Sequence, residues 1–441
     1  MYLDRIRLKN LRGFDVLDFS FLRSDATFAG WTVITGDNGS GKSTLLKAIA
    51  LALVGPDAAR ALQPSFHRWI REGAQTASIE IDVVFSTGED GFVDMGRTPV
   101  GQRFGAKLVL TTTSKEPALS VTNPTGKAGQ KSYQTPQRSI WSLSATGWFS
   151  CGYGPFRRVF GASPEATRLM VAPTTERFVT MFHEAASLAE VNQWLLGLNH
   201  KRLERRPIET RQLDEVLEIL RDDLLPNEMV IDDVDSDGLW LRDRNNVRLA
   251  WSEMSDGYRA ALALLCDILR NMSNVFGSES LIERDADGRI FVNKGGIVLI
   301  DEVDAHLHPE WQREVGFWLK RHFPRVQFIV TSHSPLICQA VDEGGLFVLP
   351  EPGSESRPRR ISEEERQHIV AGRPNEILLS QAFGLENTRS PRAVEARAKY
   401  AGLKAKQRAG ASLSKDELGS MSQLALFVGN DDGPEANNAS N

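Results

Sequence analysis

The chain has 441 residues, which is too long for one average domain, and its 41% hydrophobic and 25% charged residues are ordinary for a globular protein. A formal net charge of −5 excludes the basic signature of a chain that binds nucleic acid along its whole length. No run of eighteen apolar residues is present, the charged first residues are not those of a signal peptide, and three distant cysteines suit neither a disulfide framework nor a zinc site. We therefore expect a cytoplasmic protein with no membrane partner.

The first part of the chain combines strand patterns with one strong helix pattern. Residues 2–14 predict an edge strand and a turn, and an apolar strand then leads into a glycine loop and a helix that ends at Gly55 and Pro56. Strand patterns follow over 77–86 and 106–114. The composition of 114–147, rich in Ser, Thr, Gly, Pro and Gln, predicts an irregular insertion.

The second part begins with a helical pattern over about 165–225, which is too short and too irregular for a long coiled-coil arm. A hairpin with an Asp-Gly turn is expected over 229–251. The apolar run before Asp301 predicts a buried parallel strand, which is followed by a helix over 308–324 and another buried strand from 326. Two helices are expected near 391–409 and 415–427.

The stretch GDNGSGKST fits the phosphate-loop pattern G-x-x-x-x-G-K-[ST] between a strand and a helix. Its glycines let backbone N–H groups converge on phosphate oxygens, and the helix N-terminus adds positive potential. Lys42 is expected to reach the β- and γ-phosphates of ATP, and Ser43 to bind Mg²⁺. The residues expected to hold the nucleotide in this loop are Gly36, Asn38, Gly39, Ser40, Gly41, Lys42, Ser43 and Thr44.

The acidic pair Asp301-Glu302 ends an apolar strand, where such folds place a carboxylate beside the phosphate loop. Asp301 is expected to hold Mg²⁺, and Glu302 to orient and deprotonate the attacking water. His333 follows the next strand and is expected to sense the γ-phosphate. His306 and His308 do not share a helix face, so a structural or interface role is favoured over metal binding for them.

A second helix start, in the stretch MSDGYR, also suits a phosphate because Ser255 and Gly257 open a long apolar helix. The order of phosphate loop, Ser-x-Gly helix start, apolar Asp-Glu strand and histidine resembles the ABC-type ATPases, although Met254 and Tyr258 depart from the usual signature loop. The resemblance implies that two copies of the chain clamp two ATP molecules head to tail. Ser255 of one copy would then complete the site formed by Lys42, Asp301 and Glu302 of the other.

Within that family the start RIRLKNLRGF is similar to the SMC and RecF-like branch, where Arg12 would lie close to the nucleotide. The stretches GIVLIDEVDAHLHPEWQREVGFWLKRHFPRVQFIVTSHSPLI and AFGLENTRSPRAVEARAKYAGLKAK resemble ATPase subunits of Septu-type bacterial anti-phage systems, which also occur beside some retrons. That resemblance implies a separate HNH nuclease partner and a homodimer or higher oligomer. In WFSCGYGPFRRVFG, Arg157 and Arg158 are either nucleotide or partner contacts or a solvated pair.

Two other functions remain open on the sequence alone. A RecF-like DNA repair ATPase would bind DNA or RNA directly, and the best candidate contact is a basic cluster in which Arg202, Arg205 and Arg206 would share a helix face; the alternative is a solvated surface. The other cluster members are His200, Lys201 and Arg211. A transporter ATPase subunit would need a glutamine loop, for which Gln130, Gln134 and Gln137 are candidates without strand context.

The sequence therefore predicts an α/β fold of the ABC-type ATPase-head kind, with a mixed sheet and flanking helices, an antiparallel β lobe, a short helical insertion and a small C-terminal helical region. Too little chain follows the His333 strand for a nuclease domain, so only ATP hydrolysis is expected. The expected segments are ATPase lobe I (1–158), the helical insertion (159–225), ATPase lobe II (226–350), a linker (351–390), helices that bind the partner (391–428) and a disordered tail (429–441).

Overall fold

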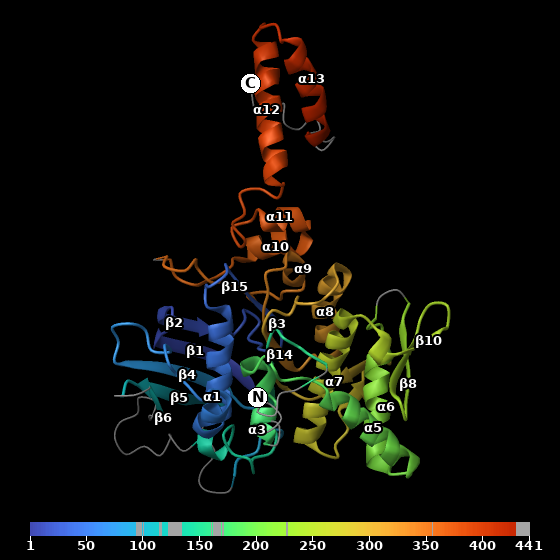
Figure 1. Cartoon of the computed structure of the whole chain (residues 1–441). Helices are drawn as coiled ribbons and strands as arrows, with labels where there is room; N and C mark the ends of the chain where they lie inside the picture. The colour runs from blue at the N-terminus through green and yellow to red at the C-terminus, as the bar shows by residue number, and fades with distance from the viewer. Residues whose placement is uncertain are drawn as a thin grey trace. The chain divides into compact units, whose positions relative to one another are not determined.

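The structure is a computed structural model with two compact units, Met1–Ile377 and Leu378–Asn441 (Figure 1). Gln130, Gln134 and the tail 429–441 lie outside the described residues, whereas Gln137 lies in the short helix η2 (Pro136–Arg138). The structure describes residues 1–93, 99, 101–113, 117–121, 135–159, 161, 169, 172–225, 228–354 and 356–428.

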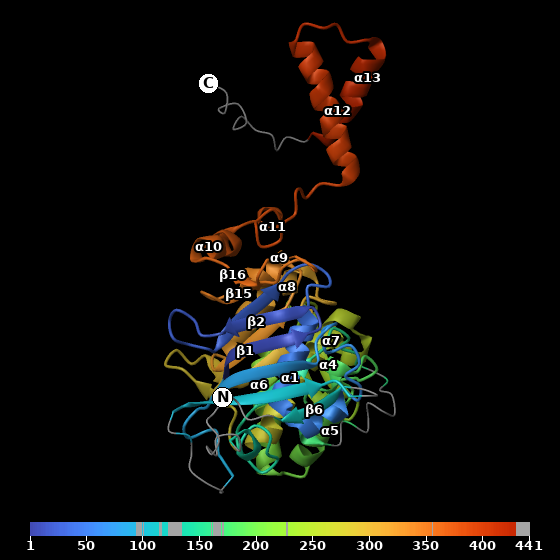
Figure 2. The ribbon, with the colours of Figure 1, turned by 90° about the vertical axis from the view of Figure 1, so that its left-hand side faces the viewer.

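A five-stranded antiparallel sheet forms one layer of the first unit (Figure 2). In spatial order its strands are β2 (Phe14–Ser20), β1 (Tyr2–Leu11), β4 (Thr76–Val84), β5 (Arg103–Thr111) and β6 (Ala118–Val121). The prediction that the first strand lies at an edge is wrong, because β1 pairs with β2 on one side and with β4 on the other. Its second neighbour lies some seventy residues further along the chain, for example Ile81 opposite Ile6, and local alternation does not reveal such a pairing.

A second sheet has six strands, five of which run parallel. In spatial order they are β16 (Arg359–Arg360), β15 (Leu346–Val348), β3 (Gly30–Thr35), β14 (Val326–Thr331), β13 (Gly296–Ile300) and β7 (Ser150–Tyr153). The central strands β3, β14 and β13 are wholly buried, which explains the unbroken apolar run of β13 and the mostly apolar sequences of the other two. Because parallel neighbours end at one edge, the loops after β3, β7, β13 and β14 meet there.

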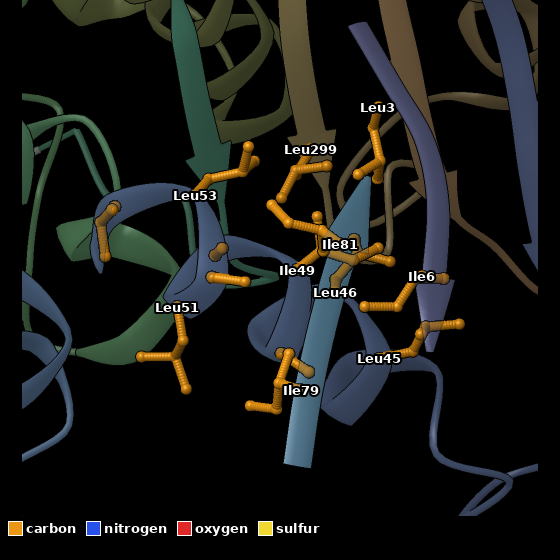
Figure 3. Close-up of a cluster of buried hydrophobic side chains, with 14 of the residues drawn as sticks. Leu3, Ile6, Leu45, Leu46, Ile49, Leu51, Leu53, Ile79, Ile81 and Leu299 are labelled. Carbon is orange, nitrogen blue, oxygen red and sulfur yellow. The ribbon is translucent and has the colours of Figure 1, made fainter. Parts of the chain in front are cut away.

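The helix after the phosphate loop, α1 (Lys42–Leu62), contacts β4 and β5 of the antiparallel sheet and β7 and β13 of the six-stranded sheet. Figure 3 shows Leu46 and Ile49 of this helix among Ile81 and Leu299, which come from the two sheets. The helical geometry breaks at Gly55, where φ is 84°, and a second helical segment continues beyond it. The first helical segment therefore ends at Gly55, where the sequence predicts an end. The apolar residues of α1 form the centre of the core of this unit.

Within the described residues of the helical insertion lie α3 (Pro173–Glu176), α4 (Val179–Phe182), α5 (Glu190–Leu203) and α6 (Pro207–Arg221). The expected hairpin is a three-stranded sheet of β8 (Val230–Asp235), β9 (Gly238–Arg242) and β10 (Arg248–Ala250). The remaining elements up to the last parallel strand are η3 (Trp251–Glu253), α7 (Asp256–Phe276), β11 (Ile282–Arg284), β12 (Ile290–Val292), α8 (Pro309–His322) and α9 (Pro335–Cys338).

Most of the segment expected as a linker is folded. β16 pairs with β15, α10 (Glu363–Ala371) follows it, and α11 (Pro374–Leu378) comes next. Gln339 donates a 2.9 Å hydrogen bond to the Gly372 carbonyl, so this segment is joined to the first unit. Ile361, Ile369 and Ile377 are buried in this segment. The residues between them are mostly polar, so the apolar positions are too sparse to indicate a strand or a helix.

The second unit contains a pair of helices, α12 (Pro391–Arg408) and α13 (Lys415–Leu424), followed by η4 (Ala425–Phe427). Ser414 and Glu417 form the expected capping box of α13. Arg397 of α12 donates to the carbonyls of Phe427 and Val428, which closes the hairpin. No helix in the described part of the chain is long and apolar enough to cross a bilayer. The predicted α/β architecture is confirmed, with its mixed sheet, antiparallel lobe, short helical insertion and C-terminal helices.

Candidate functional site

The phosphate loop joins β3 to α1 and has the backbone geometry that its glycines allow. Gly36, Gly39 and Gly41 have φ values of 142°, 81° and 99°, which favour glycine over any other residue. A Cβ at position 41 would lie 2.6 Å from the Phe14 ring, so that glycine is also required by packing. The Ser40 hydroxyl is buried without a hydrogen-bond partner. An orphaned hydroxyl inside a glycine cradle at a helix N-terminus fits the triphosphate of a nucleotide.

Lys42 folds back over the loop that precedes it. Its Nζ donates hydrogen bonds of 2.8 Å to the carbonyls of Gly36 and Asp37. Burial lowers the pKa of Lys42 below its ordinary value, and the negative charges of Asp301 and Glu302 oppose that shift. Lys42 thus lies close enough to Asp301 and Glu302 to interact with both acids electrostatically. The structure brings together these three residues, which the sequence analysis had selected separately.

The two acids follow β13 and differ in exposure. Asp301 is 2% exposed and accepts a 2.6 Å hydrogen bond at Oδ1 from the Thr331 hydroxyl. Glu302 is exposed, its φ is 47°, and its backbone N–H donates to Thr331 Oγ1 at 2.7 Å. Thr331, the last residue of β14, thus positions both acids. Sequence reasoning missed it, because its role arises from the neighbouring strand.

Arg157 lies in the loop after β7 and is buried, with 5% of its surface exposed. Its guanidinium donates to the carbonyls of Asp301, Glu302, Val303 and Ala305 at 2.9–3.4 Å. Arg158 is exposed, and its carbonyl accepts from the Leu188 N–H at 2.7 Å. The two arginines therefore have different environments. Arg157 is bonded to the loop that carries the two acids, and the side chain of Arg158 faces solvent.

His333 follows β14 and its side chain is exposed. Partial burial lowers the pKa of this histidine, as does the positive charge of Lys42, whereas Asp304 and Glu302 act in the opposite direction. Because Lys42 contributes to this shift, the His333 ring lies within electrostatic range of the phosphate loop. The next residue, Ser334, caps α9 and donates a 2.7 Å hydrogen bond to Gln312 of α8.

Arg12 comes from the turn between β1 and β2 and reaches the phosphate-loop helix. It donates a 3.3 Å hydrogen bond to Thr44 Oγ1, and its guanidinium lies 4.3 Å from the centre of the Trp69 ring. Lys47, which the sequence analysis missed, lies on the same helix. Burial lowers its pKa, Asp301 opposes the shift, and Arg12 adds to it. The available signal was one lysine within the otherwise apolar run TLLKAIALALV.

The Ser255 turn stands at the start of α7. Ser255 is the N-cap residue and is exposed, and its hydroxyl makes no capping hydrogen bond. A Cβ at position 257 would lie only 2.3 Å from the His306 carbonyl oxygen. Gly257 is therefore required for close packing of α7 against the turn that follows the acids, in addition to any approach to phosphate.

The basic cluster does not form the helical face that the sequence predicted. α5 ends at Leu203, Arg205 has a φ of 62°, and Arg206 is the N-cap of the next helix, α6. Arg202 is bonded to Asp233 and Asn199. Ion pairs also join Lys201 to Glu209, Arg206 to Glu204 and Arg211 to Glu215. Pro207 begins a new helix at this point, which separates side chains that one continuous helix would have aligned.

His308 caps α8, where its Nδ1 accepts from the Glu310 N–H at 3.4 Å. His306 has a φ of 67°, and its carbonyl packs against Gly257. Across the residues that the structure describes, no group of three or more His, Cys, Asp or Glu side chains is placed to hold a metal ion. A single buried carboxylate beside a phosphate loop fits Mg²⁺, which takes its remaining ligands from phosphates and water.

Comparisons with known proteins match both lobes. The family described as "AAA domain" matches residues 5–142, and the family described as "AAA domain, putative AbiEii toxin, Type IV TA system" matches residues 133–339. The head of an SMC protein, solved in complex with the C-terminal winged-helix domain of ScpA, aligns with a TM-score of 0.46 and 17% identity over 83% of this chain and 99% of that one.

Two curated relatives align over most of the chain. The Septu protein PtuA of Bacillus mycoides is 28% identical over 88% of this chain and 45% of its own length. The Retron Ec83 probable ATPase of Escherichia coli is 23% identical over 81% of this chain and 73% of its own length. The chain thus spans less than half of the Bacillus relative. With these relatives the predicted resemblance is confirmed: the chain matches AAA-domain families and is similar to a Septu protein and to a probable retron ATPase.

Proposed function

We propose that the chain binds ATP with Mg²⁺ and hydrolyses it. Support comes from the glycine cradle, from the orphaned Ser40 hydroxyl and from the ATPase name of the retron relative. Lys42 binds the β- and γ-phosphates, Ser43 and Asp301 hold Mg²⁺, and Glu302 orients and deprotonates the attacking water. When bound, Mg²⁺ neutralises charge on the phosphates. His333 senses the γ-phosphate, and Arg12 steadies the helix that carries the loop.

Two copies of the chain share each nucleotide in this proposal. The observation that carries it is the exposed hydroxyl of Ser255, which makes no capping bond at the start of a long helix. The N-terminus of α7 therefore offers a hydroxyl and a positive helix end to an anion from outside the chain. Within the described part of the chain, the hydrogen bonds of Ser255–Gly257 stay within α7 and the turn before it. A head-to-tail pair supplies the missing phosphate.

The test is the mass of the chain in solution, measured by light scattering with and without ATP and Mg²⁺. The proposal predicts that ATP doubles the mass of the wild-type chain and leaves the Lys42→Ala chain unchanged, because that variant lacks the phosphate ligand. A higher oligomer of nucleotide-bound pairs would appear as an even multiple. Equal masses for wild type with and without ATP, under conditions where ATP binds, would remove the nucleotide as the link between copies.

The biological role that we propose is that of an ATP-dependent sensor and scaffold in a bacterial anti-phage system, which controls a separate HNH nuclease and does not cut nucleic acid itself. The relatives named for Septu and retron systems support this role. The second unit is the proposed nuclease-binding region, because its hairpin exposes Leu418, Leu426 and Phe427. Exposed apolar side chains on a small helical hairpin suit a protein partner.

Removal of residues 378–441 tests whether ATP hydrolysis and nuclease binding reside in different parts of the chain. The cut belongs after Ile377, because α10 and Gly372 are bonded to the first unit. The shortened chain should retain ATP hydrolysis and lose the nuclease in a pull-down from native cells. Retention of the nuclease would move its binding surface to the first unit. Direct binding of DNA by the shortened chain, without any protein partner, would instead favour the DNA repair function.

A further inference from the structure

Arg157 makes an unusual set of contacts for a buried charge. Among the described residues its guanidinium donates to four main-chain carbonyls, of Asp301, Glu302, Val303 and Ala305. Burial lowers the pKa of Arg157 to about 10, and the nearby acids, Asp304 first, oppose the shift. A buried charge that is bonded to one loop over five consecutive residues fixes the path of that loop, because each lost bond would leave a buried carbonyl unsatisfied.

The loop that Arg157 holds has a backbone that needs support. Glu302 has a φ of 47° and His306 a φ of 67°, which lie in the left-handed region that a non-glycine residue keeps only where surrounding contacts maintain it. The Glu302 N–H donates to Thr331 Oγ1 at 2.7 Å, and its carbonyl accepts from Arg157 at 3.0 Å. The peptide groups on both sides of the Glu302 side chain are therefore held.

The far end of the same loop contacts the Ser255 turn. The His306 carbonyl lies where a Cβ on residue 257 would be only 2.3 Å away, so the first turn of α7 rests directly on this carbonyl. The ring centroids of Tyr258 of α7 and Trp311 of α8 lie 5.3 Å apart, so these two helices are also in contact. A shift of residues 303–306 therefore moves the helix start that carries Ser255.

We propose that Arg157 is a positioning residue that couples the two composite ATP sites of a pair. It holds Glu302 at the nucleotide of its own chain, and through the His306 carbonyl it holds the Ser255 turn that completes the site of the partner chain. This inference rests on the proposed shared site. Nη1 of Arg157 donates to the Asp301 carbonyl, and Nη2 donates to those of Glu302, Val303 and Ala305. A lysine carries one nitrogen on an unforked side chain and cannot occupy both positions.

The first test is the kinetics of the Arg157→Lys chain, with Arg157→Met as a second variant and Arg158→Met as the matched control on the exposed neighbour. The Lys variant should keep the KM for ATP within about twofold and lose about tenfold or more in kcat, since the phosphate loop is untouched and the acid is misplaced. Arg158→Met should match wild type. An unchanged kcat in a folded Arg157→Lys chain overturns the proposal; if the Met variant fails to melt cooperatively, the Lys variant alone decides.

The second test separates the effect on the partner site. Two differently tagged chains are purified as hybrids: one carries Ser255→Ala, and the other carries Glu302→Gln, which silences its own site. The single working site then combines the intact acids of the first chain with the Ser255 turn of the second. Adding Arg157→Lys to the second chain can change turnover only through that turn, and we expect a loss of about fivefold or more.

The outcomes of the hybrid test are distinct. Equal turnover with and without Arg157→Lys in the silenced chain shows that Arg157 acts only within its own site, which overturns the coupling. The reference hybrid of Ser255→Ala with Glu302→Gln must itself be active. If it is inactive although both chains fold and associate, the proposal that two chains share each ATP site is contradicted. Reduced turnover with Arg157→Lys, and full turnover with Arg158→Met in the same position, supports the coupling.

Discussion

The hydroxyl of Thr331 donates a 2.6 Å hydrogen bond to Oδ1 of Asp301, from the neighbouring strand of the same sheet. The hydroxyl oxygen of Thr331 also accepts a 2.7 Å hydrogen bond from the backbone N–H of Glu302. One hydroxyl thus fixes the carboxylate expected at Mg²⁺ and the backbone of the residue expected to activate water. Because Thr331 and Asp301 are both buried, the hydrogen bond between their side chains lies within the core.

Replacement of Thr331 by valine keeps the shape and removes the hydroxyl. The buried Asp301 oxygen and the Glu302 N–H both lose their partner, so we expect the free energy of unfolding to fall by about 1–3 kcal/mol. Turnover should fall further than ATP affinity, because the acids move while Lys42 stays in place. Urea unfolding and steady-state kinetics measure the two effects. Thr331→Ser keeps the hydroxyl and should restore most of the turnover; failure of the serine variant to do so would assign the effect to packing.

The Glu302→Gln chain should bind ATP about as well as wild type and hydrolyse it at least about 100-fold more slowly, because the amide cannot accept a proton from water. Loss of hydrolysis leaves the nucleotide in place, so the variant should persist as a pair after excess ATP is removed. Single-turnover hydrolysis and size-exclusion chromatography measure these outcomes. Unchanged turnover in Glu302→Gln would remove this residue from its proposed role and move the general base elsewhere.

His333 should titrate below the ordinary histidine value of 6.5, because burial and Lys42 both disfavour its charged form. The unfolded chain then binds the proton more tightly than the folded chain, so nucleotide-free stability falls as the pH drops below 6.5, towards the lowered pKa. His322, which is also buried with a lowered pKa, contributes in the same direction, so the wild type must be compared with His333→Gln.

Histidine ring resonances provide the direct measurement, with His333 assigned by its absence in His333→Gln. Negative phosphate near the ring favours protonation, so ATP with Mg²⁺ in the Glu302→Gln background should raise the pKa of His333. A pKa at or above 6.5 in the nucleotide-free chain would contradict the combined effect of partial burial and the Lys42 charge on this ring. A pKa that ATP leaves unchanged would contradict a contact with the γ-phosphate.

Motifs that are contiguous in the chain were predictable, and contacts between loops were not. The phosphate loop lies within nine residues, and its strand and helix are adjacent, so local patterns sufficed. Arg157 meets Asp301 across 144 residues of sequence, because β7 and β13 are neighbours in the sheet. Only that strand order brings the two loops together.

Folded structure was not predictable from the sequence where apolar residues were sparse. The segment 351–390 appeared polar, yet β16 extends the six-stranded sheet and Ile369 is buried. The prediction that the basic residues share one helix face was wrong for a different reason. α5 ends at Leu203 and a new helix begins at Pro207, so Arg202 and Arg206 do not belong to one continuous helix. In both cases the pattern described composition correctly, and the long-range packing decided the structure.

The shared site is tested most directly by mixing two inactive chains. One carries Lys42→Ala and cannot bind ATP at its own loop, and the other carries Ser255→Ala and cannot complete the site of a partner. In the hybrid, the intact phosphate loop of the second chain meets the intact Ser255 turn of the first. We predict that the mixture regains up to about one active site per hybrid pair, measured as phosphate release. If hybrid pairs form and both chains fold, but no hydrolysis returns, the shared site is contradicted.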